Sequence, residues 1–250
     1  MNMVSRTLSR LGAAASVIVL AVVPSLGQTD AGEILDRAIG KLGGEAFLAA
    51  TDVLSTGRYY QFQRGELAGG DVFRDYVKFP DKERTEFGEK RERVRINNGD
   101  RGWNIVDEVV EAQIPEQIEL FWEEFKVGLD YLLRVVLPES QATLQYVGRD
   151  MIDFRRVDIL EIRDEDRTRI NLYVDRSDGL LLKKSVRRLN SPQVHEEVYS
   201  NYHEFHGVLT PLLVTRYTGG IKTMEIRFET VTYNSDLSDD LFLADVAEDN

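Results

Sequence analysis

The 250-residue chain has no cysteine, only three histidines and a shortage of positive charge, with 31 Lys and Arg against 43 Asp and Glu. Without cysteine it can form neither disulfides nor a thiolate metal site, and it has no thiol nucleophile. A net charge of −12 disfavours nucleic acid and anionic lipid headgroups, because nonspecific affinity for phosphate comes from Lys and Arg. The composition therefore excludes disulfide-framework proteins and argues against nucleic-acid binding.

Long apolar runs are scarce. The run at residues 11–23 follows a segment with two arginines and no acid, and it precedes small residues at 24–27. This order is typical of a secretory signal peptide, and the run is shorter than the ~20 residues of a membrane span, so an anchor is the weaker alternative. Cleavage would remove two arginines and change the net charge from −12 to −14. We expect a signal peptide at 1–27 and a single periplasmic, monomeric domain at 28–250.

Two segments have helical periodicity. Asp30 and Glu33 have capping-box spacing, apolar residues follow at helical intervals, and Gly43 ends the pattern, which predicts a helix over 31–42. A longer helix is predicted between Pro115 and Pro138. Its apolar face comprises Ile118, Phe121, Trp122, Phe125, Leu129, Leu132, Leu133 and Val136. Its polar face comprises Glu119, Glu123, Glu124, Lys126 and Arg134, so we predict an amphipathic helix and not a membrane span.

Most of the remaining chain has a period of two, which is typical of strands with one buried face. Strands are predicted over residues 58–63, 71–79, 93–97, 102–106, 142–148, 155–163, 169–174, 180–188, 194–205, 209–217 and 222–233. In the last of these, Met224, Ile226 and Phe228 share an apolar face. So many consecutive strands with only two helical segments predict a mainly β (α+β) fold, in which a strongly curved antiparallel sheet wraps around the helices.

All three histidines lie among carboxylates in the segment from His195 to His206, which raises the alternative of a metal-dependent enzyme. In a strand, however, His203 and His206 point to opposite faces, and at ~3.3 Å per residue His195 lies roughly 26 Å from His203. Metal ligands must converge within about 2–2.5 Å of one ion. We therefore predict no metal site and regard this enzyme alternative as the least favoured.

Other catalytic motifs are also missing. The sequence has no Gly-x-Ser-x-Gly elbow, no phosphate-binding glycine loop and no His-Glu-x-x-His. Chance carboxylate pairs are unavoidable with 43 acids, so they do not indicate glycosidase chemistry. We predict a protein that is not an enzyme and has no catalytic residue and no cofactor.

Several short motifs resemble those of a known family. They are Lys78-Phe-Pro-Asp-Lys-Glu-Arg84, Asn98-Gly-Asp-Arg-Gly-Trp103, Tyr173-Val-Asp-Arg-Ser-Asp-Gly-Leu180, Tyr202-His-Glu-Phe-His-Gly-Val-Leu-Thr-Pro211 and Asn234-Ser-Asp-Leu-Ser-Asp-Asp-Leu-Phe242. Their order is similar to that of LolA-like proteins, the periplasmic carriers that sort outer-membrane lipoproteins, and of related regulators of the envelope stress response. The resemblance covers most of residues 28–250.

The resemblance implies an incomplete β-barrel of about 11 antiparallel strands, closed by helices over an apolar cavity. In the carriers this cavity receives acyl chains, and an arginine at the position matching Arg84 holds the helical lid. An exposed strand arginine is the alternative for Arg84. The implied partners are lipoprotein acyl chains or lipid, and a membrane protein that donates or accepts the cargo. An envelope-stress sensor or regulatory binding module of the same fold is the alternative function.

Burying ten methylenes would supply about 8 kcal/mol before ordering costs, at ~0.8 kcal/mol each, so reversible binding of acyl chains is physically reasonable. The apolar faces of the long helix and of the last strand are the candidates for the binding surface. The expected ligand-binding residues are Phe121, Trp122, Phe125, Leu129, Met224, Ile226 and Phe228. The sequence leaves open the alternative that these two faces bury each other and leave no cavity.

Overall fold

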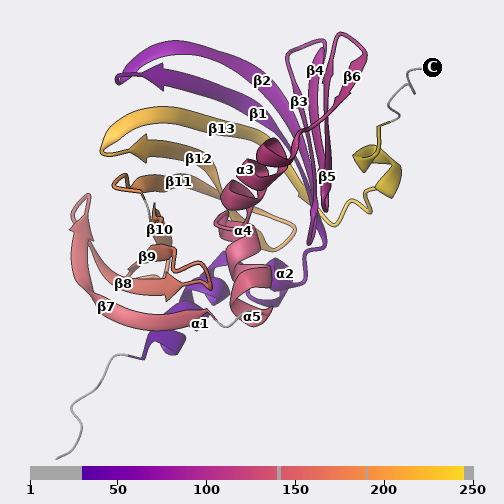
Figure 1. The fold of residues 1–250 in the computed structure, drawn as a ribbon. Helices are drawn as coiled ribbons and strands as arrows, with labels where there is room; N and C mark the ends of the chain where they lie inside the picture. Colours follow the sequence, from indigo (N-terminus) through magenta and orange to yellow (C-terminus); the bar gives the residue numbers. More distant parts are fainter. Residues whose placement is uncertain (1–29, 140–141, 190, 245–250) are drawn as a thin grey trace, which may run out of the picture.

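The computed structural model describes residues 30–139, 142–189 and 191–244, and the expected signal peptide at 1–27 lies outside them (Figure 1). Thirteen strands form one antiparallel sheet in the order β6-β5-β4-β3-β2-β1-β13-β12-β11-β10-β9-β8-β7. They are β1 Asp52–Gln63, β2 Glu66–Lys78, β3 Lys82–Phe87, β4 Arg93–Asn98, β5 Arg101–Val106, β6 Val109–Ala112, β7 Thr143–Ile152, β8 Arg155–Arg163, β9 Arg169–Asp175, β10 Leu181–Arg187, β11 His195–Phe205, β12 Val208–Thr218 and β13 Ile221–Tyr233.

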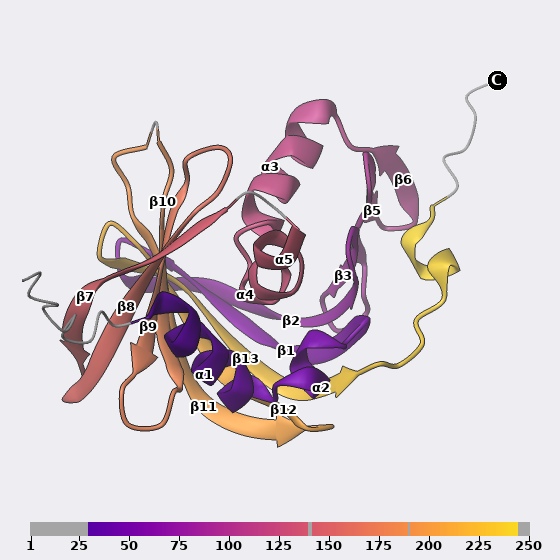
Figure 2. The same ribbon diagram turned by 90° about the horizontal axis from the view of Figure 1, so that it is seen from below.

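Pairing between β1 and β13 joins the two halves of the sheet, because β2–β6 extend from β1 in one direction and β12–β7 extend from β13 in the other. The sheet bends strongly and stays open, with β6 and β7 at its two ends (Figure 2). The predicted fold class is confirmed, with thirteen strands in place of about 11. The sequence patterns did not indicate β3, which is dominated by charged residues, or the four-residue β6.

The helices occupy the concave side of the sheet, apart from η2 near the C-terminus (Figure 2). They are α1 Ala31–Leu42, α2 Glu45–Leu48, α3 Pro115–Phe125, α4 Leu129–Tyr131, the π-helical turn η1 Leu132–Val136, α5 Leu137–Glu139 and the 3-10 turn η2 Asp239–Phe242. None of the helices in the described ranges is long and apolar enough to cross a membrane.

The predicted N-terminal helix is confirmed as α1. Asp30 caps it by accepting a hydrogen bond from the Gly32 backbone N–H at 2.8 Å. Gly43 ends it at φ 128°, in a place where a Cβ atom would lie 2.3 Å from the carbonyl oxygen of Gly207. Glycine at position 43 therefore lets α1 end against the turn between β11 and β12.

The prediction of one long helix from Pro115 to Pro138 is wrong, because the segment breaks after α3. Gly128 is extended, with ψ 140°, and turns the chain so that Val127 is buried in the core. The chain then continues through α4, η1 and α5, which we call, together with α3, the helical cover. The break bends the cover over the sheet and lets both of its parts face the concave side (Figure 2).

Two hydrophobic clusters lie on opposite faces of the sheet. The larger cluster fills one end of the concave side, where α1 residues such as Ile34 and Leu42 pack with Leu160, Leu172 and their neighbours. The smaller cluster lies on the convex side of β2–β5, under the segment that contains η2. Its buried members are Tyr76, Val94, Ile96, Trp103, Leu237 and Phe242. The apolar side chains of β2–β5 are thus buried on the outer face of the sheet, and the alternate side chains of these strands, on the inner face, can be polar.

Candidate functional site

A cavity of about 800 Å³, partly open to solvent, lies between the concave face of the sheet and the helical cover. This size is within the roughly 300–1,000 Å³ that ligand sites occupy. The concavity is therefore not filled by the protein's own side chains. Its apolar lining comprises Leu42, Phe47, Val53, Val77, Phe79, Leu120, Phe121, Phe125, Leu129, Val208, Leu209, Val214, Ile226, Phe228 and Val231.

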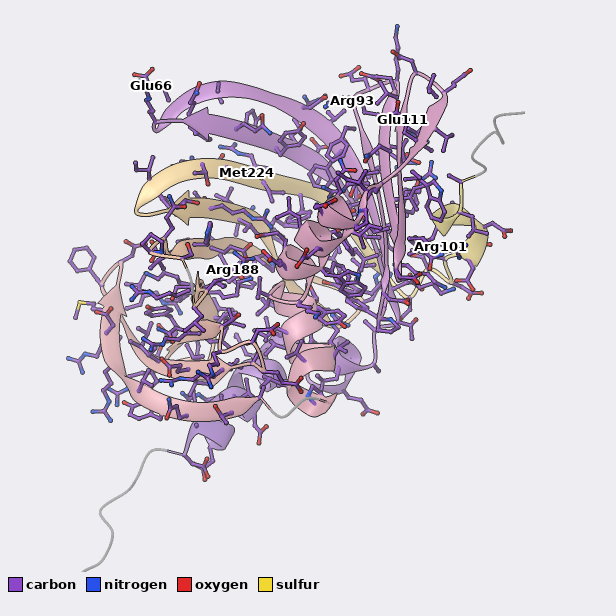
Figure 3. The ribbon with its side chains drawn as sticks, in the orientation of Figure 1. Glu66, Arg93, Arg101, Glu111, Arg188 and Met224 are labelled. Atoms are coloured by element: carbon purple, nitrogen blue, oxygen red, sulfur yellow. The ribbon has the colours of Figure 1, made fainter. Side chains whose placement is uncertain are left out.

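Five of the seven expected ligand-binding residues line the cavity: Phe121, Phe125, Leu129, Ile226 and Phe228. Trp122 and Met224 are not among the lining residues. The Trp122 ring packs against Phe121, Phe125 and Tyr131, and its Nε1 donates to the carbonyl of Gly99 at 2.9 Å. Trp122 therefore holds α3 to the turn between β4 and β5. Met224 lies further along β13, opposite Arg216 (Figure 3).

On the opposite half of the sheet, β10 and the residue after it hold the cover. Arg188 follows β10 and donates to the carbonyl of Glu123 and the carboxylate of Glu124, at 3.0 and 2.8 Å (Figure 3). Lys184 of β10 donates to the carbonyl of Val127, where the cover is broken. The cover is thus bound to both halves of the open sheet, and it partly covers the cavity between them.

Arg134, on η1, fixes the cover to the elements below it. Only 3% of its side chain is exposed. Its guanidinium donates to the Ala50 carbonyl at 3.3 Å and to Asp130 at 2.9 Å, and its Cζ lies 4.1 Å from the centre of the Phe47 ring. The prediction that Arg134 lies on the solvent face of the helix is therefore wrong, because the break in the helix turns it inward.

Arg84, the expected lid-holding residue, has different partners. Its Nη1 donates to the Leu241 carbonyl at 3.2 Å and its Nε donates to Glu86 at 2.9 Å. It pairs across strands with Tyr76 and Ile96, which belong to the cluster on the convex side. Arg84 thus joins the sheet to the C-terminal segment, and Arg134 makes the contacts that a lid-holding arginine would need.

A group of charged side chains enters the cavity wall from β10, β11 and β12. Glu197 accepts from Lys184 at 2.8 Å, lies 2.9 Å from Arg216 and accepts from the hydroxyl of Tyr199 at 2.7 Å. Burial raises the pKa of Glu197, but Lys184 and Arg216 outweigh it and lower the pKa to about 2. Glu197 in turn raises the pKa of Arg216. Glu197 and Arg216 are therefore both charged near neutral pH.

Asp75 and Glu83 form a second group of ionisable side chains, on β2 and β3. Asp75 accepts a hydrogen bond from the Thr85 hydroxyl at 2.9 Å, and Glu83 lies 3.3 Å from Arg95. Burial, followed by the charge of Glu83, raises the pKa of Asp75 to about 8. Burial also raises the pKa of Glu83, against the opposing effect of Arg95. Both carboxyls therefore hold a proton at higher pH than exposed carboxyls do.

The histidines lie along β11 and the turn after it. His195 contacts Thr218 at 3.3 Å, His203 contacts Asn201 at 3.1 Å, and His206 is in the turn at φ 52°. Within the described ranges, no three His, Asp or Glu side chains are grouped so that they could hold a metal ion.

Sequence reasoning missed the polar side of the cavity because alternation does not show which face of a strand points inward. In β4 the apolar residues Val94 and Ile96 were the natural candidates for the inner face, yet they lie on the convex side. Arg95, between them, lines the cavity. The signal that could have revealed this is the apolar run Leu241-Phe242-Leu243, which needs a second apolar surface to cover.

We compared the chain with known proteins and with solved structures. No family model matches the chain, and no curated protein matches its sequence. Three solved structures have the same fold at low sequence identity. A DUF1329 family protein from Desulfovibrio piger is 15% identical with a TM-score of 0.61, over 85% of this chain and 97% of that one. A Vibrio parahaemolyticus domain named for outer-membrane lipoprotein sorting is 12% identical with a TM-score of 0.59, over the same shares.

The third structure is a LolA superfamily protein from Nitrosomonas europaea. It is 13% identical with a TM-score of 0.60, over 86% of this chain and 97% of that one. These likenesses confirm the expected LolA-like fold, in which an open curved sheet lies against helices. Because the identities are low, they establish the fold alone.

Proposed function

We propose that this protein is a non-catalytic periplasmic binding or carrier protein that holds the acyl chains of lipids or lipoproteins in its cavity. The observation that carries the proposal is the partly open cavity with a largely apolar lining. The LolA-like fold supports it, because the Vibrio parahaemolyticus domain with this fold is named for lipoprotein sorting. A membrane protein that donates or accepts the cargo is part of the proposal.

The apolar part of the lining comes from two surfaces that face each other. Phe121, Phe125 and Leu129 contribute from the cover, while Ile226 and Phe228 contribute from β13. An acyl chain between them would gain about 0.8 kcal/mol for each methylene removed from water. Ten buried methylenes would supply about 8 kcal/mol, which is enough for reversible binding after ordering costs.

Mass spectrometry of the protein purified from its native envelope tests the proposal directly. We expect acyl-bearing molecules to accompany the folded protein and to be released when it unfolds. Repeated native spectra of bare protein alone would overturn the proposal.

A cavity-filling substitution supplies the matched control. Ile226→Trp places a larger ring in the cavity and should weaken the binding of a fluorescent C16 fatty-acyl probe about tenfold or more. Glu229→Trp adds the same ring to an exposed position on the same strand and should leave the affinity unchanged. Equal affinities for both variants would place the probe outside this cavity.

A further inference from the structure

One row of polar side chains crosses the concave face from the cavity to the free edge of the sheet. Cross-strand pairing places its members directly opposite one another on six consecutive strands, from β1 to β6. They are Ser55, Asp75, Thr85, Arg95, Asn104 and Glu111, which we call the polar row. Ser55, Asp75, Arg95 and Asn104 line the cavity, and Glu111 marks the outer end of the row (Figure 3).

The cavity therefore has two different walls. In the other direction from Ser55, the pairing continues to Val231 on β13, where the lining becomes apolar. On the polar side, Gln113 and Gln117 add amide groups to the lining. A chain composed only of methylenes would leave the polar wall without partners, and burying polar groups unpaired costs free energy. Beyond β13, the charged residues of the lining, Glu197 and Arg216, are paired with each other. The polar row and the apolar wall of β13 together match a molecule with one apolar end and one polar end.

The charges in the lining show which polar group fits. Its five carboxylates are Asp75, Glu83, Glu124, Asp130 and Glu197. Four of them lie within ion-pair distance of an arginine or lysine. Asp75 has no cation within that distance among the described residues, and the more distant Arg95 only partly opposes the rise of its pKa. The two arginines of the lining, Arg95 and Arg216, are already paired with Glu83 and Glu197. The ionisable group left for a ligand is therefore the Asp75 carboxyl and not a cation.

Unused hydrogen-bond acceptors point the same way. A carboxylate can accept about four hydrogen bonds, and Asp75 accepts one, from Thr85. The unused acceptor capacity of Asp75 faces the cavity, because Asp75 is one of the lining residues. An anionic group placed there would meet Asp75 and Glu83 with no free cation among the lining residues.

We propose that the cavity takes an amphiphile whose polar head carries hydrogen-bond donors and no negative charge, with the head against Asp75 on the polar row and the chain against the apolar wall. The inference rests on the proposed function and adds the class of ligand to it. Hydroxyl groups and an ammonium group both satisfy this chemistry. Free fatty acids and alkyl phosphates do not.

Chain-matched amphiphiles test the inference. Delipidated protein is titrated calorimetrically at pH 9, where the Asp75 carboxyl, with a pKa of about 8, is mostly ionised, with dodecylamine, dodecyl maltoside and dodecanoate, each below its critical micelle concentration. We expect the amine, the maltoside or both to bind about tenfold or more tightly than dodecanoate, since a hydrogen bond to a charged group contributes that much. Whichever of the two binds more tightly identifies the head as ammonium or hydroxyl.

Asp75→Asn removes the charge and keeps the size, and it should reduce the preference of the amine over dodecanoate about tenfold. Glu66→Gln, at the tip of the β1–β2 hairpin, is the matched control and should leave the preference unchanged (Figure 3). Circular dichroism confirms that both variants fold. Equal binding of all three amphiphiles, or tightest binding of dodecanoate, would overturn the inference and leave the carrier proposal standing. Binding of none of them would overturn both.

Discussion

Lys184 lies between Glu197 and the Val127 carbonyl, with only 3% of its side chain exposed. Lys184→Met leaves that carbonyl without its donor and leaves Glu197 with Arg216 as its remaining cation. Breaking a buried pair of this kind costs about 3–5 kcal/mol. We expect this loss in the free energy of unfolding, measured by urea denaturation followed by circular dichroism.

Lys183 is the matched control because it is adjacent in sequence and faces the other side of the sheet, where it pairs with Glu196. With 22% of the Lys183 side chain exposed, Lys183→Met should cost about 0–1 kcal/mol. Equal losses for the two variants would show that the Lys184 ion pair contributes nothing beyond the loss of a lysine.

Asp75 makes the stability of the empty protein depend on pH. Its folded pKa of about 8 exceeds the ordinary value of 3.8, so between these values the folded protein holds a proton that the unfolded chain has released. Stability from this group therefore falls as the pH rises from about 4 to 8. Asp75→Asn should remove this dependence and stabilise the delipidated protein by about 1–3 kcal/mol at pH 8 relative to wild type.

Thermal denaturation between pH 5 and 8 measures the effect. Asp100→Asn, in the exposed turn between β4 and β5, is the control and should follow the wild-type curve. If the stability of Asp75→Asn depended on pH in the same way as that of the wild type, the prediction would be wrong, because ionisation of Asp75 would then cost no stability.

At the scale of elements, the sequence predicted α1 and most strands because caps, glycines and periodicity act locally. It did not predict β3, whose charged residues form one strand only because β2 and β4 flank it. It also did not predict the break at Gly128, which is stabilised by a distant partner, Lys184. Local patterns cannot show a contact between residues that are far apart in sequence.

Arg134 binds the helical cover and Arg84 binds the C-terminal segment, so substitutions of the two arginines should affect different parts of the molecule. Arg134→Met removes hydrogen bonds to Ala50 and Asp130 and should speed amide hydrogen exchange in α3–α5 about tenfold or more. Arg84→Met removes the bond to Leu241 and should speed exchange around residues 237–243 instead. Faster exchange of the cover in Arg84→Met alone would restore Arg84 as the lid-holding residue.

At the scale of the whole molecule, the two hydrophobic clusters lie on opposite faces of one continuous sheet. If residues 28–250 form a single domain, as we propose, damage to the smaller cluster should lower the stability of the entire chain. Phe242 is fully buried there, so Phe242→Ala should cost about 3–5 kcal/mol. One unfolding transition should shift in both far-ultraviolet circular dichroism and tryptophan fluorescence.

Leu243→Ala, beside it, is the control, because Leu243 is 47% exposed and should cost less than about 1 kcal/mol. Two separate transitions in Phe242→Ala, with only one of them shifted, would divide the chain into two domains.

The sequence by itself determined the class of fold and five of the residues that line the cavity, since strand alternation and helix amphipathicity are fixed by residues close together in the chain. Only the tertiary structure decided which face of β2–β5 points inward, because the C-terminal segment covers the apolar side of these strands. That choice brings the polar row, distributed from residue 55 to residue 111, into one line beside the cavity. Cross-strand register places these side chains together, and register depends on pairing between segments that are distant in sequence.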